Sequence, residues 1–174
     1  MNNSSIPDFS ELHDLATRAH HRATGESLGR VSINILLKHV TALLGEVLSE
    51  VLRPYDLCYK NYLIMVMLYS RPDSTANPSE LCTGIAETRS NMTRLTDDLV
   101  HRGWAQRVTN REDRRRIDLS LTPAGEALLQ VVMPLLRAHI ARIYEPFAEA
   151  ELDQMEHLLH KLVLILEAQR GASA

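Results

Sequence analysis

The sequence predicts a mainly helical protein with one small β-hairpin, and three observations lead to this fold class. Leucine, alanine, glutamate and arginine are abundant, whereas aromatic residues make up only 5% of the chain, a composition that favours helix. Apolar residues recur three and four apart over residues 28–52 and 150–168, as in helices that bury one side. Between residues 104 and 121 the apolar pattern alternates instead, as in half-buried strands.

The N-terminal part should consist of helices joined by short breaks. A short apolar pattern covers residues 12–19, and a long one covers residues 28–52 and ends before Pro54. The apolar band of the long helix is wider than one face, so we expect a second subunit to cover one of its sides. Residues 61–69 predict a further helix, and the polar residues 73–76 predict a loop.

Two helices separated by a tight turn come next. Asn77 is a good N-cap and Glu80 could reach back to that cap, so a short helix should begin here. A second helix should begin at Thr88 and stop at Gly103. Two helices in this arrangement predict a helix-turn-helix.

The β-hairpin follows directly after the second of these helices. Its strands are expected at residues 104–108 and 117–121, on either side of a polar tip. A hairpin in this position is the wing of a winged helix-turn-helix. Helices over residues 122–144 and 150–168 should complete the chain, with Thr122 as the N-cap of the first.

Positive charge is concentrated in this region. The whole chain carries a net charge of −3, but residues 89–116 hold eight arginines against four acidic residues. A basic patch on an acidic body is typical of a surface that binds phosphate, and arginine can contact phosphate through two hydrogen bonds at once. The alternative is a solvated charged face that binds nothing.

The second helix of the predicted helix-turn-helix has one apolar and one polar side. Met92, Leu95 and Leu99 fall on one side, which leaves the other free to enter a major groove. The N-terminal half of such a helix contacts the bases. The residues expected to read or position the major groove are Arg89, Ser90, Asn91, Thr93 and Arg94. An ordinary amphipathic surface helix is the alternative.

The tip of the wing is rich in arginine. Arg114 and Arg115 are expected to bind the minor groove or its phosphates, because a narrow minor groove attracts inserted arginine. Asp113 is expected to act within the chain, by fixing one arginine before DNA binds. The alternative is a solvated turn, in which aspartate and asparagine simply favour the loop.

Three motifs in this region carry a family resemblance: Asn91-x-Thr93-Arg94-x-x-Asp97-x-Leu99-x-x-Arg102-Gly103-Trp104, Asp113-Arg114-Arg115, and Leu119-x-Leu121-Thr122-x-x-Gly125. With them the chain resembles the MarR family of bacterial regulators over roughly residues 28–166, and within it the EmrR/MprA branch of multidrug efflux repressors. The resemblance implies a homodimer held by interleaved N- and C-terminal helices. It also implies that Arg115 reaches the minor groove and that Asp113 organises it.

The sequence therefore predicts a mainly α, winged helix-turn-helix homodimer that represses transcription in response to a ligand and binds double-stranded DNA at an inverted-repeat operator. Three parts are expected: an N-terminal arm and dimerisation helix at residues 1–54, a DNA-binding domain at 55–121, and C-terminal dimerisation helices at 122–174. One alternative is a redox- or metal-sensing regulator of the same fold. Another is a helical ligand-binding dimer that no longer binds DNA.

A small aromatic or lipophilic effector is expected to bind beside the long N-terminal helix. The residues expected to contact it are Ile35, His39, Tyr62, Met65 and Tyr69. Aromatic and methionine side chains suit an adaptable apolar pocket, although plain core packing is the alternative for each residue. The family resemblance places the effector cleft between the dimerisation helices and the winged helix.

Other chemistry finds little support. The chain has neither a glycine-rich phosphate loop nor a nucleophile motif, so we expect no enzyme activity and no cofactor. His157 and His160 offer two ligands, whereas zinc needs four, so no metal site is expected. Cys58 and Cys82 are expected to be buried thiols of a cytoplasmic protein. We expect no signal peptide and no apolar run that could span a membrane.

Overall fold

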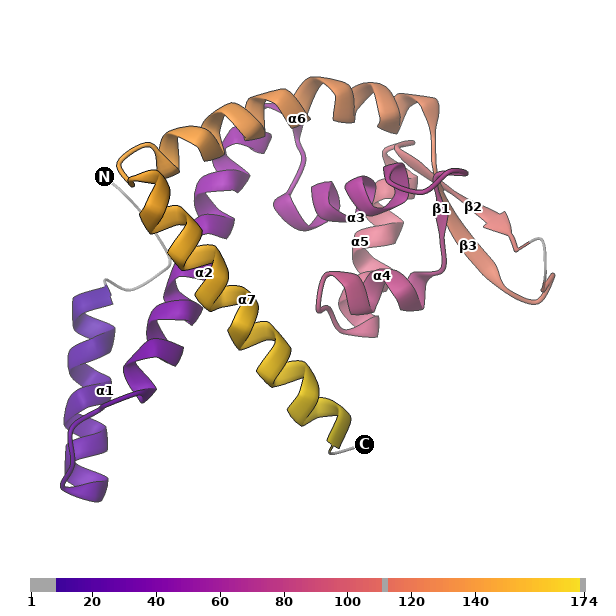
Figure 1. Ribbon diagram of the computed structural model, residues 1–174. Helices are drawn as coiled ribbons and strands as arrows, with labels where there is room; N and C mark the ends of the chain where they lie inside the picture. The colour runs from indigo at the N-terminus through magenta and orange to yellow at the C-terminus, as the bar shows by residue number, and fades with distance from the viewer. Residues whose placement is uncertain (1–8, 111–112, 173–174) are drawn as a thin grey trace. The chain divides into compact units, whose positions relative to one another are not determined.

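The computed structural model describes residues 9–110 and 113–172. It divides into two compact units, Met1–Val132 and Met133–Ala174, and helix α6 (Pro123–Tyr144) runs across the division. Within the described ranges the chain is mainly helical and carries one small antiparallel sheet, as predicted (Figure 1).

The first unit begins with α1 (Phe9–Thr24) and α2 (Val31–Leu52), followed by the short 3-10 helix η1 (Arg53–Tyr55). Helix α1 is longer than the predicted 12–19, because the polar residues that flank its apolar stripe also form helix readily. It contacts α2, and the ring of Phe9 lies 5.4 Å from that of His39, centroid to centroid.

Helix α2 corrects one expectation from the sequence. The segment Val31–Tyr55 has a mean hydropathy of 1.5 and is long and apolar enough to cross a membrane by length and composition alone. The expectation that no such run exists was therefore wrong. The same composition fits a helix whose apolar side packs against another subunit, because both surroundings exclude water.

The winged helix occupies the rest of the first unit. Helices α3, α4 and α5 lie beside a three-stranded sheet with the order β1-β3-β2 (Figure 1). The bounds are α3 (Tyr59–Tyr69), β1 (Thr75–Ala76), α4 (Pro78–Gly84), α5 (Arg89–His101), β2 (Ala105–Thr109) and β3 (Ile117–Leu121). The two longer strands and the helix-turn-helix are where the sequence predicted them.

Strand β1 corrects the prediction of a loop over residues 73–76. Thr75 pairs with Ser120 and Ala76 with Leu119, so β3 has a neighbour on each side. A two-residue strand is too short to show any alternation, and it forms because the free edge of β3 offers unpaired N–H and C=O groups.

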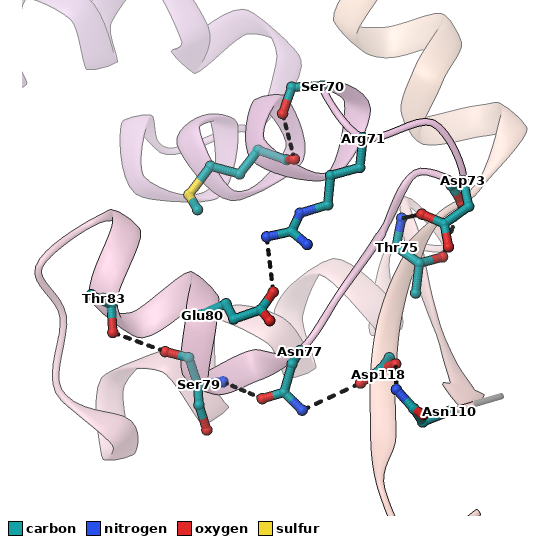
Figure 2. Close-up of polar contacts among 11 residues, drawn as sticks. Ser70, Arg71, Asp73, Thr75, Asn77, Ser79, Glu80, Thr83, Asn110 and Asp118 are labelled. Carbon is teal, nitrogen blue, oxygen red and sulfur yellow. Dashed lines mark hydrogen bonds and ion pairs between the residues drawn. The ribbon is translucent and has the colours of Figure 1, made fainter. Parts of the chain in front are cut away.

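The helices of the helix-turn-helix begin and end at the capping residues that the sequence predicted. Asn77 Oδ1 accepts from Ser79 N at 2.8 Å, and Thr88 Oγ1 accepts from Asn91 N at 3.3 Å. Gly103, at φ +73°, ends α5 in the left-handed conformation. Glu80 does not reach back to its cap as predicted. Its carboxylate instead lies 2.8 Å from Arg71 Nη2, because an ion pair is available there (Figure 2).

The start of α6 is fixed against the end of α5. Thr122 Oγ1 accepts from Gly125 N at 3.1 Å and donates to Gly103 O at 2.6 Å. A Cβ atom at Gly125 would lie 2.2 Å from the carbonyl oxygen of Trp104, so this position requires glycine. The first turn of α6 therefore belongs to the winged-helix core.

The second unit contains the end of α6 and helix α7 (Glu149–Ala172). Among the described residues of α7, none is buried. Apolar side chains are nevertheless frequent on it, and six of them are exposed: Leu158, Leu159, Val163, Leu164, Ile165 and Leu166.

Candidate DNA-binding surface

Helix α5 has the two sides that the sequence predicted. Met92, Leu95 and Leu99 are at most 1% exposed and anchor the helix in the core. The predicted contact residues lie on the other side, where Arg89, Ser90, Thr93 and Arg94 are exposed and Asn91 is half-buried. The helix therefore presents a continuous polar face on a rigid support.

A polar network fixes the first turns of α5. Asn91 donates from Nδ2 to a Glu87 carboxylate oxygen at 2.6 Å, and Arg94 donates to Asn91 Oδ1, from Nη2 at 3.0 Å. Glu87 also forms an ion pair with Lys60, at the start of α3. The hydrogen bond from Lys60, followed by that from Asn91, holds the pKa of Glu87 below its ordinary value. Asn91, predicted as a reader of bases, thus also holds Arg94 in place.

The wing tip is ordered by main-chain hydrogen bonds. Asp113 Oδ1 accepts from the backbone N–H of Arg115 at 3.0 Å, and Asp113 O accepts from the N–H of Arg116 at 2.9 Å. Asp113 therefore organises Arg115 through its backbone rather than through the guanidinium. The side chains of Arg114 and Arg115 are exposed.

Two of the described arginines in the basic segment form ion pairs with carboxylates. Arg102 pairs with Asp56 and with Asp98, and its guanidinium carbon lies 5.2 Å from the centroid of the Trp104 ring. The hydrogen bonds to Asp56 and then Asp98 raise the pKa of Arg102 above its ordinary value. Arg107 pairs with Asp97. Because Arg102 and Arg107 are paired with carboxylates, a count of arginines overstated the free positive charge. Arg111 lies outside the described residues.

A buried carboxylate near the wing was not predicted from the sequence. Asp118 is 7% exposed, although strand alternation placed it on the polar side of β3. It accepts hydrogen bonds from Asn77 Nδ2 at 3.3 Å and from Asn110 Nδ2 at 2.6 Å, as Figure 2 shows. No spacing in the sequence brings these three residues together, because they come from the start of α4 and from the two ends of the wing loop.

Two pockets lie in the first unit. One, of about 350 Å³, is lined by residues of α4, α5, β2 and β3, including Arg89 and Thr93. The other, of about 1090 Å³, lies along α2 and is closed by Cys58, Tyr59, Lys60, Arg94 and Leu95. The larger pocket thus adjoins both the start of α3 and the candidate recognition helix.

The five predicted effector residues are not brought together in these pockets. Met65 is fully buried in the core, and His39 is buried against Phe9. Ile35 is half-buried on α2 and Tyr69 is exposed at the end of α3. Their types suited a pocket, but two of the five, His39 and Met65, are buried inside the subunit instead.

Tyr62 is half-buried and packs against a neighbouring ring. Its ring is stacked on that of Tyr59, with centroids 6.0 Å apart. Burial, followed by the neighbouring Tyr59 hydroxyl, raises the pKa of the Tyr62 phenol above its ordinary value. Only Tyr59 of this pair lines the larger pocket.

The two cysteines differ in how far they are exposed to solvent. Cys58 is exposed, which corrects the expectation that it is buried, and Cys82 is half-buried. Cys58 Sγ accepts the N–H of Asn61 at 3.4 Å as the N-cap of α3, and a cap lies at the surface end of its helix. His157 and His160 are exposed on α7. Within residues 9–110 and 113–172, no three His, Cys, Asp or Glu side chains group as metal ligands.

Comparison with known proteins shows which regulators the chain resembles. No family model matches the chain. The transcriptional repressor MprA of Escherichia coli K12 is 29% identical over 132 residues, which cover 76% of this chain and 75% of MprA. Wild-type apo MarR of E. coli is 25% identical with a TM-score of 0.60, over 73% of this chain and 93% of MarR. In sequence and in fold the chain is similar to MarR-family regulators. The proteins that it resembles are transcriptional regulators rather than enzymes.

Two structures with the MarR fold contain bound molecules. A mutant of E. coli MarR complexed with operator DNA has a TM-score of 0.68 at 24% identity, over 82% of this chain and 96% of that protein. CouR from Rhodococcus jostii, bound to p-coumaroyl-CoA, has a TM-score of 0.66 at 22% identity, over 75% of this chain and 90% of CouR.

Proposed function

We propose that this protein is a ligand-responsive repressor of the MarR family that binds double-stranded operator DNA. The observation that carries the proposal is the exposed polar face of α5, which is held by a buried apolar side and preceded by α4. A major groove accommodates one α-helix with such a face. The operator complex of a MarR mutant with the same fold supports the proposal.

A second copy of the chain is the partner that covers the exposed apolar residues. On α2 these include Leu36, Val40 and Val47, and on α7 they include Leu159 and Val163. Permanent homodimers bury more than about 2,000 Å² in total, and helices of this length can supply that area. Two-fold symmetry then requires an inverted-repeat operator, with recognition helices about 34 Å apart.

Each contact residue has a proposed role. Arg89, Ser90, Asn91, Thr93 and Arg94 read or position the major groove, and Asn91 does so while it orients Arg94. Arg114 and Arg115 bind the minor groove or its phosphates, and Asp113 organises the backbone that carries them.

The effector is a small aromatic or lipophilic compound, and we place it in the pocket of about 1090 Å³. Tyr59 offers an aromatic wall, and Lys60 and Arg94 offer a cationic anchor. Because Arg94 also belongs to the DNA-binding face, an occupant that engages it prefers the form that does not bind DNA. CouR bound to p-coumaroyl-CoA supports response to a small molecule.

The remaining features follow from this function. The chain serves as a cytoplasmic protein, with its dimerisation helices at residues 1–54 and 122–174 and its DNA-binding domain at 55–121. The apolar side of α2 is covered by the second copy rather than by a membrane. The similarity to the repressor MprA supports control of multidrug efflux genes.

The test measures binding to DNA from upstream of the protein's own gene by fluorescence anisotropy. Arg115→Ala is expected to weaken binding to every sequence at least about tenfold, since a hydrogen bond from a charged group contributes about 1.5–3 kcal/mol. Thr93→Ala and Arg94→Ala should instead change which sequences are preferred. Arg22→Ala, on exposed α1, is the control and should bind as the wild type does.

The rival is a helical ligand-binding dimer without DNA binding. It would be favoured if the wild-type protein bound neither this DNA nor any sequence from a random pool. If Arg115→Ala bound as tightly as the wild type, the assignment of the wing would be wrong.

A further inference from the structure

A buried carboxylate connects the helix-turn-helix to the wing. Asp118 lies in the central strand β3, and its two oxygens accept from different partners, Asn77 on one side and Asn110 on the other (Figure 2). Asn77 is also the N-cap of α4, where its Oδ1 accepts from Ser79 N at 2.8 Å. The carboxylate is therefore fixed to the first turn of the helix-turn-helix.

From Asp118 the hydrogen bonds continue to the tip of the wing. Asn110 Oδ1 accepts from Asp113 N at 2.8 Å, and Asn110 N donates to Arg116 O at 2.9 Å. Asp113 Oδ1 in turn accepts from Arg115 N at 3.0 Å. A continuous chain of hydrogen bonds thus runs from the cap of α4 to the backbone of the arginine that the proposed function assigns to the minor groove.

The chemistry of this chain requires a carboxylate at its centre. Asn77 and Asn110 both present an NH₂ group to residue 118, so residue 118 must supply two acceptors. In the part of the chain described here, Asp118 forms no ion pair. A buried carboxylate with neutral partners is costly for stability, so its presence calls for a role beyond packing.

We propose that Asp118 is a positioning residue that sets the wing arginine Arg115 relative to the recognition helix, so that both engage DNA together. The inference rests on the proposed function, because it concerns how tightly the operator is bound. A wing fixed in advance loses less conformational entropy on binding.

The first experiment is a double-mutant cycle between Asp118→Asn and Arg115→Ala, read as operator affinity. Asparagine has the same shape but only one acceptor, and a flipped Asn77 or Asn110 would only move the mismatch to the N–H of Ser79 or Asp113. Asp118→Asn should weaken binding about tenfold in the wild type and have almost no effect once Arg115 is alanine. A loss of equal size in both backgrounds would overturn the proposal.

Two rescue variants keep the test independent of folding. Asn110→Asp with Asp118→Asn, and Asn77→Asp with Asp118→Asn, each restore every hydrogen bond of the chain and leave the net charge unchanged. Asp is also a good N-cap at position 77. Both double variants should bind within about twofold of the wild type. If neither restores affinity, the hydrogen-bond chain does not position the wing.

The same measurements separate this inference from the proposed function. If wild-type protein does not bind the operator, the proposed function fails. If the wild type binds and Arg115→Ala weakens it, but Asp118→Asn acts additively, the function stands and only the positioning role of Asp118 is overturned. Circular dichroism and thermal unfolding of each variant give the fraction of the protein that is folded. Each operator affinity is then calculated from the concentration of folded protein.

Discussion

Helices α5 and α7 both carry large apolar side chains, but only α5 buries them within its own subunit. Helix α5 buries Met92, Leu95, Thr96 and Leu99, whereas none of the described residues of α7 is buried. Asn91, in the first turn of α5, is also bonded within the chain to Glu87. The apolar side of α5 is therefore covered within one chain.

The difference shows which part of the molecule folds on its own contacts and which depends on association. Exposed apolar side chains along a helix of 24 residues are unfavourable in water, and a second copy can remove them from water. Substitutions on α5 should therefore act on the fold of one chain. Substitutions on α7 should act on the assembly.

The largest expected effect is the truncation of a core residue of α5. Leu99 is fully buried, so Leu99→Ala should lower the free energy of unfolding by about 2–5 kcal/mol. Urea denaturation followed by circular dichroism measures this loss. As for the wild type, the midpoint of the variant should still rise with protein concentration, because the dimer interface is intact.

A smaller effect is expected for a charge placed on α7. Leu159 is 43% exposed, and Leu159→Asp should raise the dissociation constant of the dimer about 30-fold or more, as at an interface hot spot of about 2 kcal/mol. Light scattering over a dilution series measures the change. The control is Lys161→Asp at an exposed polar position of the same helix, which should remain dimeric. A dimer of unchanged affinity in the Leu159 variant would break the comparison with α5.

The smallest effect concerns pH and the polar start of α5. The pKa of Glu87 is lowered in the fold, so its interactions stabilise the protein above the ordinary value of 4.5 and are lost as pH falls through the lowered value. The stability difference between wild type and Glu87→Gln should therefore be largest at neutral pH and shrink below pH 4.5. Urea midpoints at a series of pH values measure it. A difference that does not change with pH would show that the charge of Glu87 contributes nothing.

The sequence predicted the helices and the wing because their signals are local. Periods of 3.6 and of two, with the caps Asn77, Thr88 and Thr122, are properties of neighbouring residues. Strand β1 escaped prediction because two residues carry no period. Its position depends on the free edge of β3, which is far away in the sequence.

The sequence indicated which residues lie on the candidate DNA-binding surface, but it did not indicate which residues they contact. Arg94 and Arg115 lie exposed on α5 and the wing, as the patterns indicated. Asp118 was missed because alternation along one strand does not show that both faces of a central strand are covered. Met65 lies in the core, since a side chain that suits a pocket also suits a core.

The paired state of Arg102 and Arg107 has a consequence for how the protein responds to ionic strength. An arginine that neutralises a phosphate releases counterions condensed on DNA, and log K falls by about 0.9 per log unit of salt for each such contact. An arginine that already has a carboxylate partner releases few of these counterions. Five described arginines of the segment lack such a partner: Arg89, Arg94, Arg114, Arg115 and Arg116. Operator affinity should therefore fall less steeply with added salt than the arginine content of this region implies.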